Sequence, residues 1–411
     1  MLMVIVASLV AILIWAVLAA RLERWHVSGP VAMACAGIVT GLVVGPGIGT
    51  DLNTDIAEKT AELILAVLLF VDATEVRGGF LAGERGLVGR LLGIALPLTI
   101  VLAFGLGVLL LDGSSWAVLL AVACVVMPID FAPAAGLLRD GRWPRRVRHT
   151  VAVESGYNDG IFSPVFAFAL LYLSQSHTED LGTAVGAALQ AAGIALLVGV
   201  VVGAASGALV WVSVRRGWTR TSGVRIVMVL VPLIVYAIAT PLGGNGFVAA
   251  FLAGIAYKLC RNARADGQTD IPAAELSAVE DLATTTSMIM WFVFGAVGVL
   301  VLEIGFQWTW ILYALLALTV VRLVPVLASM LGSHLPWRER IGLGVLGPRG
   351  TSSIVFGLLA YNAMNDDDGD IAVYVMVVVV LASLLLHGVA MAVRARSTHA
   401  SGSEPHPTAA H

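Results

Sequence analysis

The sequence predicts an all-α polytopic membrane protein with about thirteen transmembrane helices. Of its 411 residues, 59% are hydrophobic and only 12% are charged, and the mean hydropathy is +0.93. Soluble domains are on average about half apolar and about a quarter charged. Apolar runs such as MLMVIVASLVAILIWAVLAA and IAVYVMVVVVLASLLLHGVAMAV are long enough to cross a bilayer as helices. The composition therefore excludes a soluble globular chain.

Apolar segments follow one another along nearly the whole chain. The predicted spans are residues 2–20, 30–46, 59–76, 90–111, 115–138, 150–174, 183–213, 224–240, 245–260, 283–302, 306–332, 341–362 and 371–393. The first run has no basic region before it and no clear cleavage site after it, so we expect a retained helix. A membrane domain is thus expected over residues 1–394, and the polar stretch 395–411 is expected to be a short disordered tail.

The connections between the spans alternate in charge. Basic stretches such as RDGRWPRRVRH and RRGWTRTSGVR follow odd-numbered spans, whereas acidic stretches such as DLNTDIAE and NDDDGD follow even-numbered ones. The positive-inside rule places the basic connections in the cytoplasm. This pattern predicts a multi-pass protein of the cell inner (plasma) membrane, with its N-terminus outside and its C-terminus cytoplasmic. An odd number of spans requires the same arrangement of the termini.

Proline and glycine interrupt two of the predicted spans. In the fifth span, CVVMPIDFAPAAG holds Asp130 between two prolines, and in the twelfth, LGVLGPRGTSSIVFG holds Arg349 among two glycines and a proline. Interrupted helices at matching positions of two inverted halves indicate a transporter site near the bilayer midplane. The sequence therefore predicts inverted repeats, helices 1–6 and 8–13, whose broken helices 5 and 12 cross near the midplane.

The sixth span carries four polar side chains within six positions, in the stretch ESGYNDG. Glu154 and Asn158 are four residues apart, as are Ser155 and Asp159, so we expect them to form one stripe that faces the protein interior. Two carboxylates there cannot both stay ionised without a cation. Arg349 keeps its charge, so we expect it to pair with Glu154. Asp159 is then free to bind a proton or a cation.

Oxygen groups near Asp159 suit a hard monovalent cation. The Ser155 hydroxyl and the backbone carbonyls freed at the break around Asp130 can supply them. On the third span, Asp72 is expected to point into the bundle, whereas Glu75 is expected to reach the interface.

Other ionisable side chains in the apolar segments are expected to be structural. Arg322 is predicted to form an ion pair, with Glu280 or with a helix end, and His387 is predicted to be a hydrogen-bonded core histidine. The three cysteines lack metal-ligand spacing, so the sequence predicts no cofactor.

These motifs resemble those of monovalent cation/proton antiporters of the NhaP type. ESGYNDG (154–160) is similar to that family's glutamate-serine-x-x-asparagine-aspartate-glycine signature. MPIDFAPAAGLLRD (127–140) resembles its broken fifth helix, and GPRG (347–350) its broken twelfth helix. FVDATEVR and NGFVAAFLAG also resemble family segments, so the resemblance covers nearly the whole membrane domain.

The resemblance implies a homodimer, a scaffold domain and a moving core domain that work by alternating access. It implies one shared site where sodium, lithium or potassium competes with protons. Asp159 would be the carboxylate that binds the cation or the proton, with Ser155 as a nearby ligand. Asn158 holds the position that separates electroneutral members from electrogenic relatives, and Asp130 belongs to the crossing of the broken helices, where its charge would offset helix dipoles.

The resemblance also assigns supporting roles and exposes two departures. Glu154 and Arg349 match the family's stabilising ion pair, and Asp72 matches its third-helix acid, although the register leaves Glu75 open. At the fifth helix, the family threonine is Ile129 and the following proline position is Phe131; these two positions are read here as departures. Ile129 keeps its backbone carbonyl as a ligand but lacks the hydroxyl, a change that bears on cation choice more than on exchange.

The predicted function is secondary active, electroneutral exchange of a monovalent cation for a proton. The partners are then monovalent cations, protons and the lipid bilayer, with no nucleic acid. The alternatives are an ion-coupled symporter, a cation channel on a related scaffold, or a family member that does not transport. A channel filter would need rings of carbonyls or charges, and no such sequence is present. An aspartyl protease needs two acids that share a proton, and no partner motif accompanies Asp130, so we do not expect an enzyme.

Overall fold

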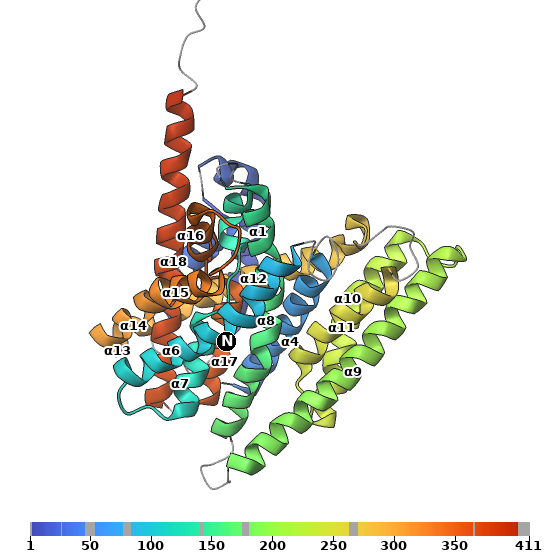
Figure 1. The fold of residues 1–411 in the computed structure, drawn as a ribbon, viewed down its shortest axis with the longest axis horizontal. Coiled ribbons are helices and arrows are strands. Elements are labelled where there is room, and N and C mark those ends of the chain that lie inside the picture. The colour runs from blue at the N-terminus through green and yellow to red at the C-terminus, as the bar shows by residue number, and fades with distance from the viewer. Residues whose placement is uncertain are drawn as a thin grey trace, which may run out of the picture.

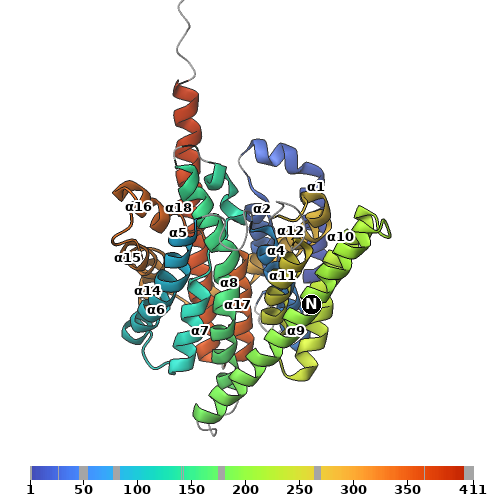
Figure 2. The same cartoon turned by 45° about the vertical axis from the view of Figure 1, so that its right-hand side comes forward.

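In the computed structural model, the chain is described over residues 2–25, 27–45, 54–76, 84–139, 141, 143–174, 181–262, 270–364 and 366–401. Every regular element in these ranges is helical. The sequence also predicts the basic connections RGGFLAGERGLVGR (77–90) and KLCRNARADG (258–267), and parts of both, residues 77–83 and 263–267, lie outside the described residues. Figures 1 and 2 show a bundle of packed helices, with the long helices α9 and α10 on one side and α13–α16 on the other.

The helices follow most of the predicted spans, but the helix predicted from residue 283 begins at Ala273, and the predicted span 306–332 is two helices that meet at Thr319. The elements are α1 (Leu2–Arg24), α2 (Gly29–Val44), α4 (Asp55–Glu75), α5 (Arg85–Arg90), α6 (Leu96–Leu110), α7 (Trp116–Val126), α8 (Arg145–Ser174), α9 (Leu181–Arg215), α10 (Thr221–Ala239), α11 (Gly246–Asn262), α12 (Ala273–Val297), α13 (Leu300–Ile304), α14 (Trp308–Leu318), α15 (Val320–Ser329), α16 (Trp337–Val345), α17 (Thr351–Ala363) and α18 (Asp366–Ser401). Short 3-10 helices cover Ala132–Arg139 and Thr240–Leu242, and a π-helical turn, Leu91–Ala95, joins α5 to α6. All-helical architecture is thus confirmed for the described residues.

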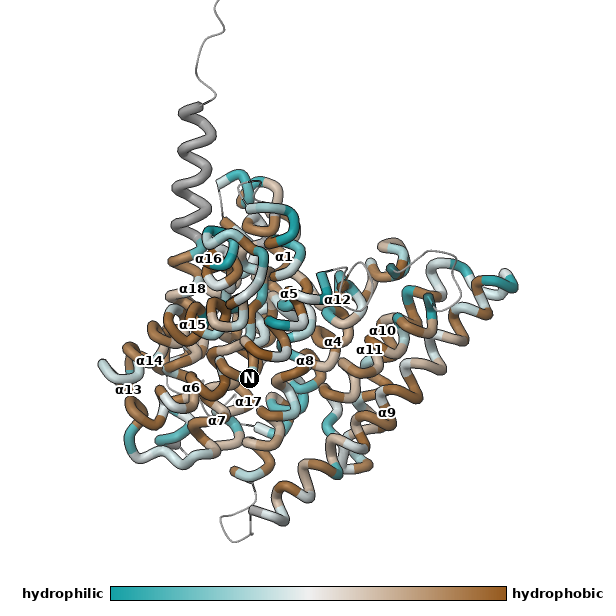
Figure 3. The backbone as a smooth tube through the Cα atoms, in the orientation of Figure 1, coloured by the Kyte–Doolittle hydropathy of each residue, from teal (hydrophilic) through white to brown (hydrophobic). Residues whose placement is uncertain are grey.

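Seven helical stretches within the described residues are long and apolar enough to cross a membrane. Two shorter apolar helices, α2 and α7, accompany them. Hydrophobic residues dominate the middles of the helices, and hydrophilic residues gather at many of their ends, as Figure 3 shows. A multi-pass membrane protein is therefore supported, while the count of about thirteen stays a prediction.

Local sequence explains where individual helices begin and end. Helix α4 begins at Asp55, earlier than predicted, because the Thr54 hydroxyl accepts a hydrogen bond from the Ala57 backbone N–H at 3.3 Å. The acids Asp55 and Glu58 in its first turn complement the positive end of the helix dipole. Helix α18 continues to Ser401, so residues 395–401 are helical and not part of a disordered tail; residues 402–411 lie outside the described residues.

Small residues let neighbouring helices approach backbone to backbone. A Cβ added at Gly203 of α9 would lie 2.4 Å from the Ala253 carbonyl oxygen of α11, and one added at Gly295 of α12 would lie 2.0 Å from that of Ala34 in α2. Both contacts are shorter than van der Waals distances, so only glycine fits. Close packing of this kind is how helices associate where lipid offers no hydrophobic driving force.

Candidate functional site

Two interrupted helices meet beside α8. Helix α7 ends at Val126 before the 3-10 helix that starts at Ala132, and α16 ends at Val345 before α17 starts at Thr351. The Asp130 backbone N–H donates to the Pro348 carbonyl at 2.8 Å. The Thr351 backbone N–H donates to Asp130 Oδ2 at 2.7 Å. The predicted contact between the two breaks is therefore present.

Asp130 places a negative charge at the start of α17. The first N–H groups of a helix have no partner within it, and they carry the positive end of its dipole. A Cβ added at Gly350 would lie 2.3 Å from Asp130 Oδ2. Glycine at this position is what lets the carboxylate reach the helix start.

Asp159 lies on α8 and is 2% exposed. The Ser352 hydroxyl of α17 donates a hydrogen bond to its Oδ2 atom. Its Oδ1 atom has no hydrogen-bond partner among the described residues. A buried polar atom left unpaired costs about 1–3 kcal/mol, and more when charged, so this oxygen is a candidate for binding a proton or a cation.

Oxygen groups from the first break lie next to α8. The Ser155 hydroxyl, half-buried on the same helix, donates to the Ile129 carbonyl at 2.8 Å. The predicted backbone ligand and the predicted hydroxyl ligand are thus in direct contact.

A cavity of about 720 Å³ connects these groups. Its lining includes Asp72, Glu75, Ile129, Asp130, His149, Ser155, Asp159, Glu280, Ser287, Thr351 and Ser352. The third-span acids Asp72 and Glu75 both line it, so the structure does not choose between their two registers. Most of the predicted cation-binding residues therefore surround one space.

The structure divides the predicted polar stripe of α8 between two environments. Ser155 and Asp159 line the cavity, whereas Glu154 and Asn158 do not, although each is only 1% exposed. Asn158 Oδ1 has no hydrogen-bond partner among the described residues. Residues four apart share a face, but adjacent residues lie about 100° apart around a helix, so the two pairs face different neighbours.

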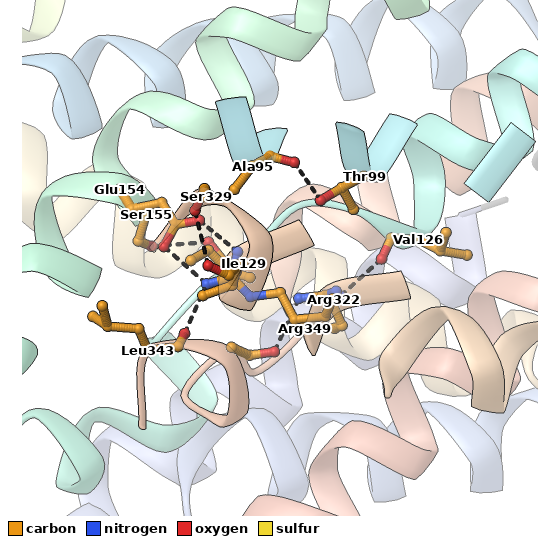
Figure 4. A network of polar contacts seen from close by, with 12 residues as sticks. Ala95, Thr99, Val126, Ile129, Glu154, Ser155, Arg322, Ser329, Leu343 and Arg349 are labelled. Atoms are coloured by element: carbon orange, nitrogen blue, oxygen red, sulfur yellow. Dashed lines mark hydrogen bonds and ion pairs between the residues drawn. The ribbon is translucent and has the colours of Figure 1, made fainter. Parts of the chain in front are cut away.

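The predicted ion pair between Glu154 and Arg349 is wrong. Instead, Arg322 of α15 donates to Glu154 through two nitrogens: Nη1 to Oε1 at 2.5 Å and Nη2 to Oε2 at 2.8 Å (Figure 4). Arg322 also donates to the Leu343 carbonyl at 3.1 Å. A two-nitrogen fork onto one carboxylate is the strong geometry for such a pair. Arg322 is thus an ion-pair residue as expected, with Glu154 and not Glu280 as its acidic partner. Its contact with Leu343, in the last turn of α16, matches the predicted alternative of a helix end.

Arg349 binds backbone carbonyls at the two breaks. Its Nε atom donates to the Val126 carbonyl at 2.8 Å, and its Nη1 atom donates to the Gly347 carbonyl at 2.9 Å (Figure 4). Val126 is the last residue of α7, where carbonyls lack helical partners and carry the negative end of the dipole. Arg349 does not pair with Glu154 because these carbonyls occupy its guanidinium, while Arg322 binds Glu154.

A histidine and a serine of α18 hold the second break in place. The Ser383 hydroxyl accepts from the Arg349 backbone N–H at 2.8 Å. His387 Nδ1 lies 2.9 Å from the Ser383 carbonyl, and its Nε2 lies 3.3 Å from the Val345 carbonyl. His387 is therefore a hydrogen-bonded core histidine, as expected.

Sequence reasoning missed the hydroxyls at the start of α17. Ser352 contacts Asp159, and the Thr351 hydroxyl lies 2.7 Å from that of Ser287 on α12. The available signal was the run TSS directly after the GPRG break, at the first turn of a half-helix. Hydroxyls in the first turn of a half-helix that starts at the break lie close to the groups that surround the break, here Asp159 and Ser287.

Comparisons with known proteins point to a single family. The model of the family described as "Sodium/hydrogen exchanger, transmembrane" matches residues 5–394. A Na⁺/H⁺ antiporter of Schizosaccharomyces pombe is 22% identical over 358 residues, which cover 79% of this chain and 74% of that protein. The uncharacterised Na⁺/H⁺ exchanger YjcE of Escherichia coli is 29% identical over 200 residues, covering 47% of this chain but only 35% of that protein.

The fold has a solved counterpart. The sodium proton antiporter MjNhaP1 from Methanocaldococcus jannaschii, determined at pH 8, superposes with a TM-score of 0.73 and 18% sequence identity, covering 94% of this chain and 99% of that one. A second structure of MjNhaP1, from electron microscopy, gives a TM-score of 0.66 at 17% identity. At this identity the likeness shows a shared fold. Since the family model spans nearly all of the residues, the chain belongs to the sodium/hydrogen exchanger family.

Proposed function

We propose that this protein is an electroneutral antiporter that exchanges one monovalent cation for one proton by alternating access. The cation is sodium, with lithium or potassium as the other candidates. One observation carries the proposal: the buried Asp159 carboxylate lines a cavity where two broken helices meet, and one of its oxygens is unpartnered. The family and the antiporter relatives support the same activity.

Competition for Asp159 couples the two ions. With a proton or a cation bound, the site is neutral, and the core can move past the apolar barrier. With the carboxylate bare, an unpaired charge makes that movement costly by about 3 kcal/mol or more. Exchange is then favoured over leak. Because Asn158 is neutral, a single carboxylate carries either ion, and no net charge moves.

The remaining site residues have supporting roles in this proposal. Ser155 and the Ile129 carbonyl contribute oxygen ligands, and Asp130 offsets the positive start of α17. Asp72 or Glu75 adds negative charge to the cavity. These assignments follow the geometry of the cavity and the family resemblance together.

Two buried arginines keep the site in shape. Arg322 forms an ion pair with Glu154, and Arg349 donates hydrogen bonds to one backbone carbonyl at each break, those of Val126 and Gly347. Glu154 is thereby neutralised by Arg322, which leaves Asp159 as the carboxylate of α8 that can exchange ions.

We further propose the inverted-repeat topology for this chain, with about thirteen spans and broken helices that cross near the bilayer midplane. The cavity extends to Glu75, His149 and Glu280. Glu75 and His149 adjoin the basic connections predicted to be cytoplasmic, so the cavity would open to the cytoplasm. A homodimer in the plasma membrane completes the proposal, and it rests on the family resemblance.

Proteoliposomes with an internal acid gradient and a pH dye test this function. Sodium, lithium, potassium and choline are added in turn, with the membrane potential clamped and then unclamped. We expect at least one metal cation, but not choline, to make the vesicle interior more alkaline. The rate should be the same with the membrane potential clamped and unclamped. In Asp159→Asn the rate should fall at least a hundredfold. Exchange that survives in Asp159→Asn would overturn the mechanism, and currents far above a turnover cycle would favour a channel.

A further inference from the structure

Three consecutive hydroxyl residues open α17, and their surroundings differ. The Thr351 hydroxyl contacts that of Ser287 at 2.7 Å, and the Ser352 hydroxyl donates to Asp159. The Ser353 hydroxyl is fully buried and has no partner among the described residues. Of the three, only Ser352 therefore contacts Asp159, the carboxylate proposed to exchange ions.

The Ser352 hydroxyl is directed at the site and not at its own helix. The N-cap of α17 is Gly350, which has no side chain, and the carboxylate that accepts from the first N–H of the helix is that of Asp130. Ser352 is 4% exposed, lines the cavity with Asp159, and its hydroxyl crosses from α17 to α8. A serine that merely stabilised the first turn would bond to the backbone of that turn.

A hydroxyl that donates its proton still has two lone pairs. Ser352 can therefore donate to Asp159 Oδ2 while the same oxygen faces a cation held by the carboxylate. The unpartnered Oδ1 atom of Asp159, the Ser155 hydroxyl and the Ile129 carbonyl border the same cavity. Hard monovalent cations prefer such oxygen groups.

The two breaks offer different oxygen groups to the cavity. Ile129 in the first break offers its carbonyl alone, and that carbonyl already accepts from Ser155. Ser352 places a hydroxyl at Asp159 from the opposite broken helix. The second break thus supplies a side-chain oxygen where the first supplies a backbone carbonyl.

We propose that the Ser352 hydroxyl is a cation ligand that sets the affinity and choice of cation at the Asp159 site. This inference rests on the proposed function of that site and goes beyond it, because it names a further specificity-determining residue on α17.

Cation binding and cation exchange test this role separately. Wild type, Ser352→Ala, Ser352→Thr and Ser353→Ala are purified, and the rise in thermal unfolding midpoint is followed against sodium and lithium concentration at fixed pH. A bound cation at free concentration c stabilises the folded protein by RT ln(1 + c/Kd), so the dependence of the midpoint on cation concentration reports the affinity. The same four proteins are then assayed in proteoliposomes for apparent KM and maximal rate.

We expect Ser352→Ala to weaken sodium binding and to raise its apparent KM by about tenfold, as the loss of one such contact predicts. The KM should change more than the maximal rate, and the sodium-to-lithium ratio should change as well. Ser352→Thr should restore both values, and Ser353→Ala should match wild type.

Two results would overturn the inference. One is an unchanged cation midpoint and KM in Ser352→Ala; the other is an equal change in Ser353→Ala, which would indicate a packing effect. If wild type binds sodium but exchanges nothing, the proposed function fails while the binding titration still decides the role of Ser352. If wild type binds no cation at all, both proposals are wrong.

Discussion

The two breaks in the bundle carry side chains of opposite charge, and each side chain compensates a helix end. At the first, between α7 and its 3-10 continuation, Asp130 accepts a hydrogen bond from the N-terminal N–H of α17. At the second, between α16 and α17, Arg349 donates to the C-terminal carbonyl of α7. Each break thus supplies the side chain that satisfies the helix end exposed by the other.

The two breaks differ in what they offer to a cation. Apolar side chains, Ile129 and Phe131, flank Asp130, so the first break contributes a backbone carbonyl and a compensating charge. The second break is followed by hydroxyls, of which Ser352 reaches Asp159. The comparison indicates that charge balance is shared between the breaks, whereas only the second break brings a side-chain hydroxyl to Asp159.

The largest effect is expected from Arg349→Met, which tests the shared charge balance. The carbonyls of Val126 and Gly347 would lose their buried donor, and each unsatisfied group costs about 1–3 kcal/mol. We expect a loss of about 3 kcal/mol in the free energy of unfolding, measured by denaturation in detergent, together with loss of exchange.

Arg340→Met is the matched control for Arg349→Met. Arg340 also donates to two carbonyls, those of Leu335 at 2.9 Å and Ser333 at 2.8 Å, but it is half-buried. Water can replace its bonds, so the loss should stay below about 1 kcal/mol. Equal losses in the two variants would refute a special role for the carbonyls at the breaks.

A smaller effect is expected from Asp130→Asn, which keeps the shape of the first break but removes its charge. The amide oxygen can still accept from the Thr351 N–H, so the geometry survives while the charge-assisted bond becomes a neutral one. We expect a loss of about 1 kcal/mol in unfolding free energy and a several-fold slower exchange in proteoliposomes. A loss as large as that in Arg349→Met would contradict the expectation that a neutral amide preserves the contact at the first break.

The smallest effect is expected from Ile129→Thr, which adds a hydroxyl to the first break and so erases its difference from the second. Ile129→Val is the control because valine has the shape of threonine without the hydroxyl. We expect the apparent KM for sodium to fall about threefold to tenfold in the threonine variant, and to stay near wild type in the valine variant. Identical KM values would mean that ligands come from the backbone at this break.

Local sequence patterns were enough to predict much of the architecture. The spans, the two breaks and the cluster on α8 were readable because hydropathy, proline and glycine act on neighbouring residues. The position of Asp159 in an apolar segment was enough to mark it, since a buried carboxylate needs a partner or a task. Helix ends were less predictable, as at α4, where a threonine cap set the start.

The sequence did not show which arginine pairs with Glu154. Glu154 and Arg322 are 168 positions apart, and their contact depends on how α8 and α15 are rotated and placed. The sequence showed two deep arginines and offered no local reason to prefer one. The family resemblance favoured Arg349 as the partner of Glu154, but the Arg349 guanidinium binds the carbonyls of Val126 and Gly347 instead.

The sequence by itself determined that this chain is a helical membrane protein with two broken helices and a buried carboxylate, because these features follow from local hydropathy and backbone chemistry. Only the tertiary structure decided that Arg322 holds Glu154, that Ser155 and Asp159 face the cavity while Asn158 does not, and that Ser352 touches Asp159. Those contacts arise where helices distant in sequence approach, and their distances depend on packing rather than on spacing along the chain.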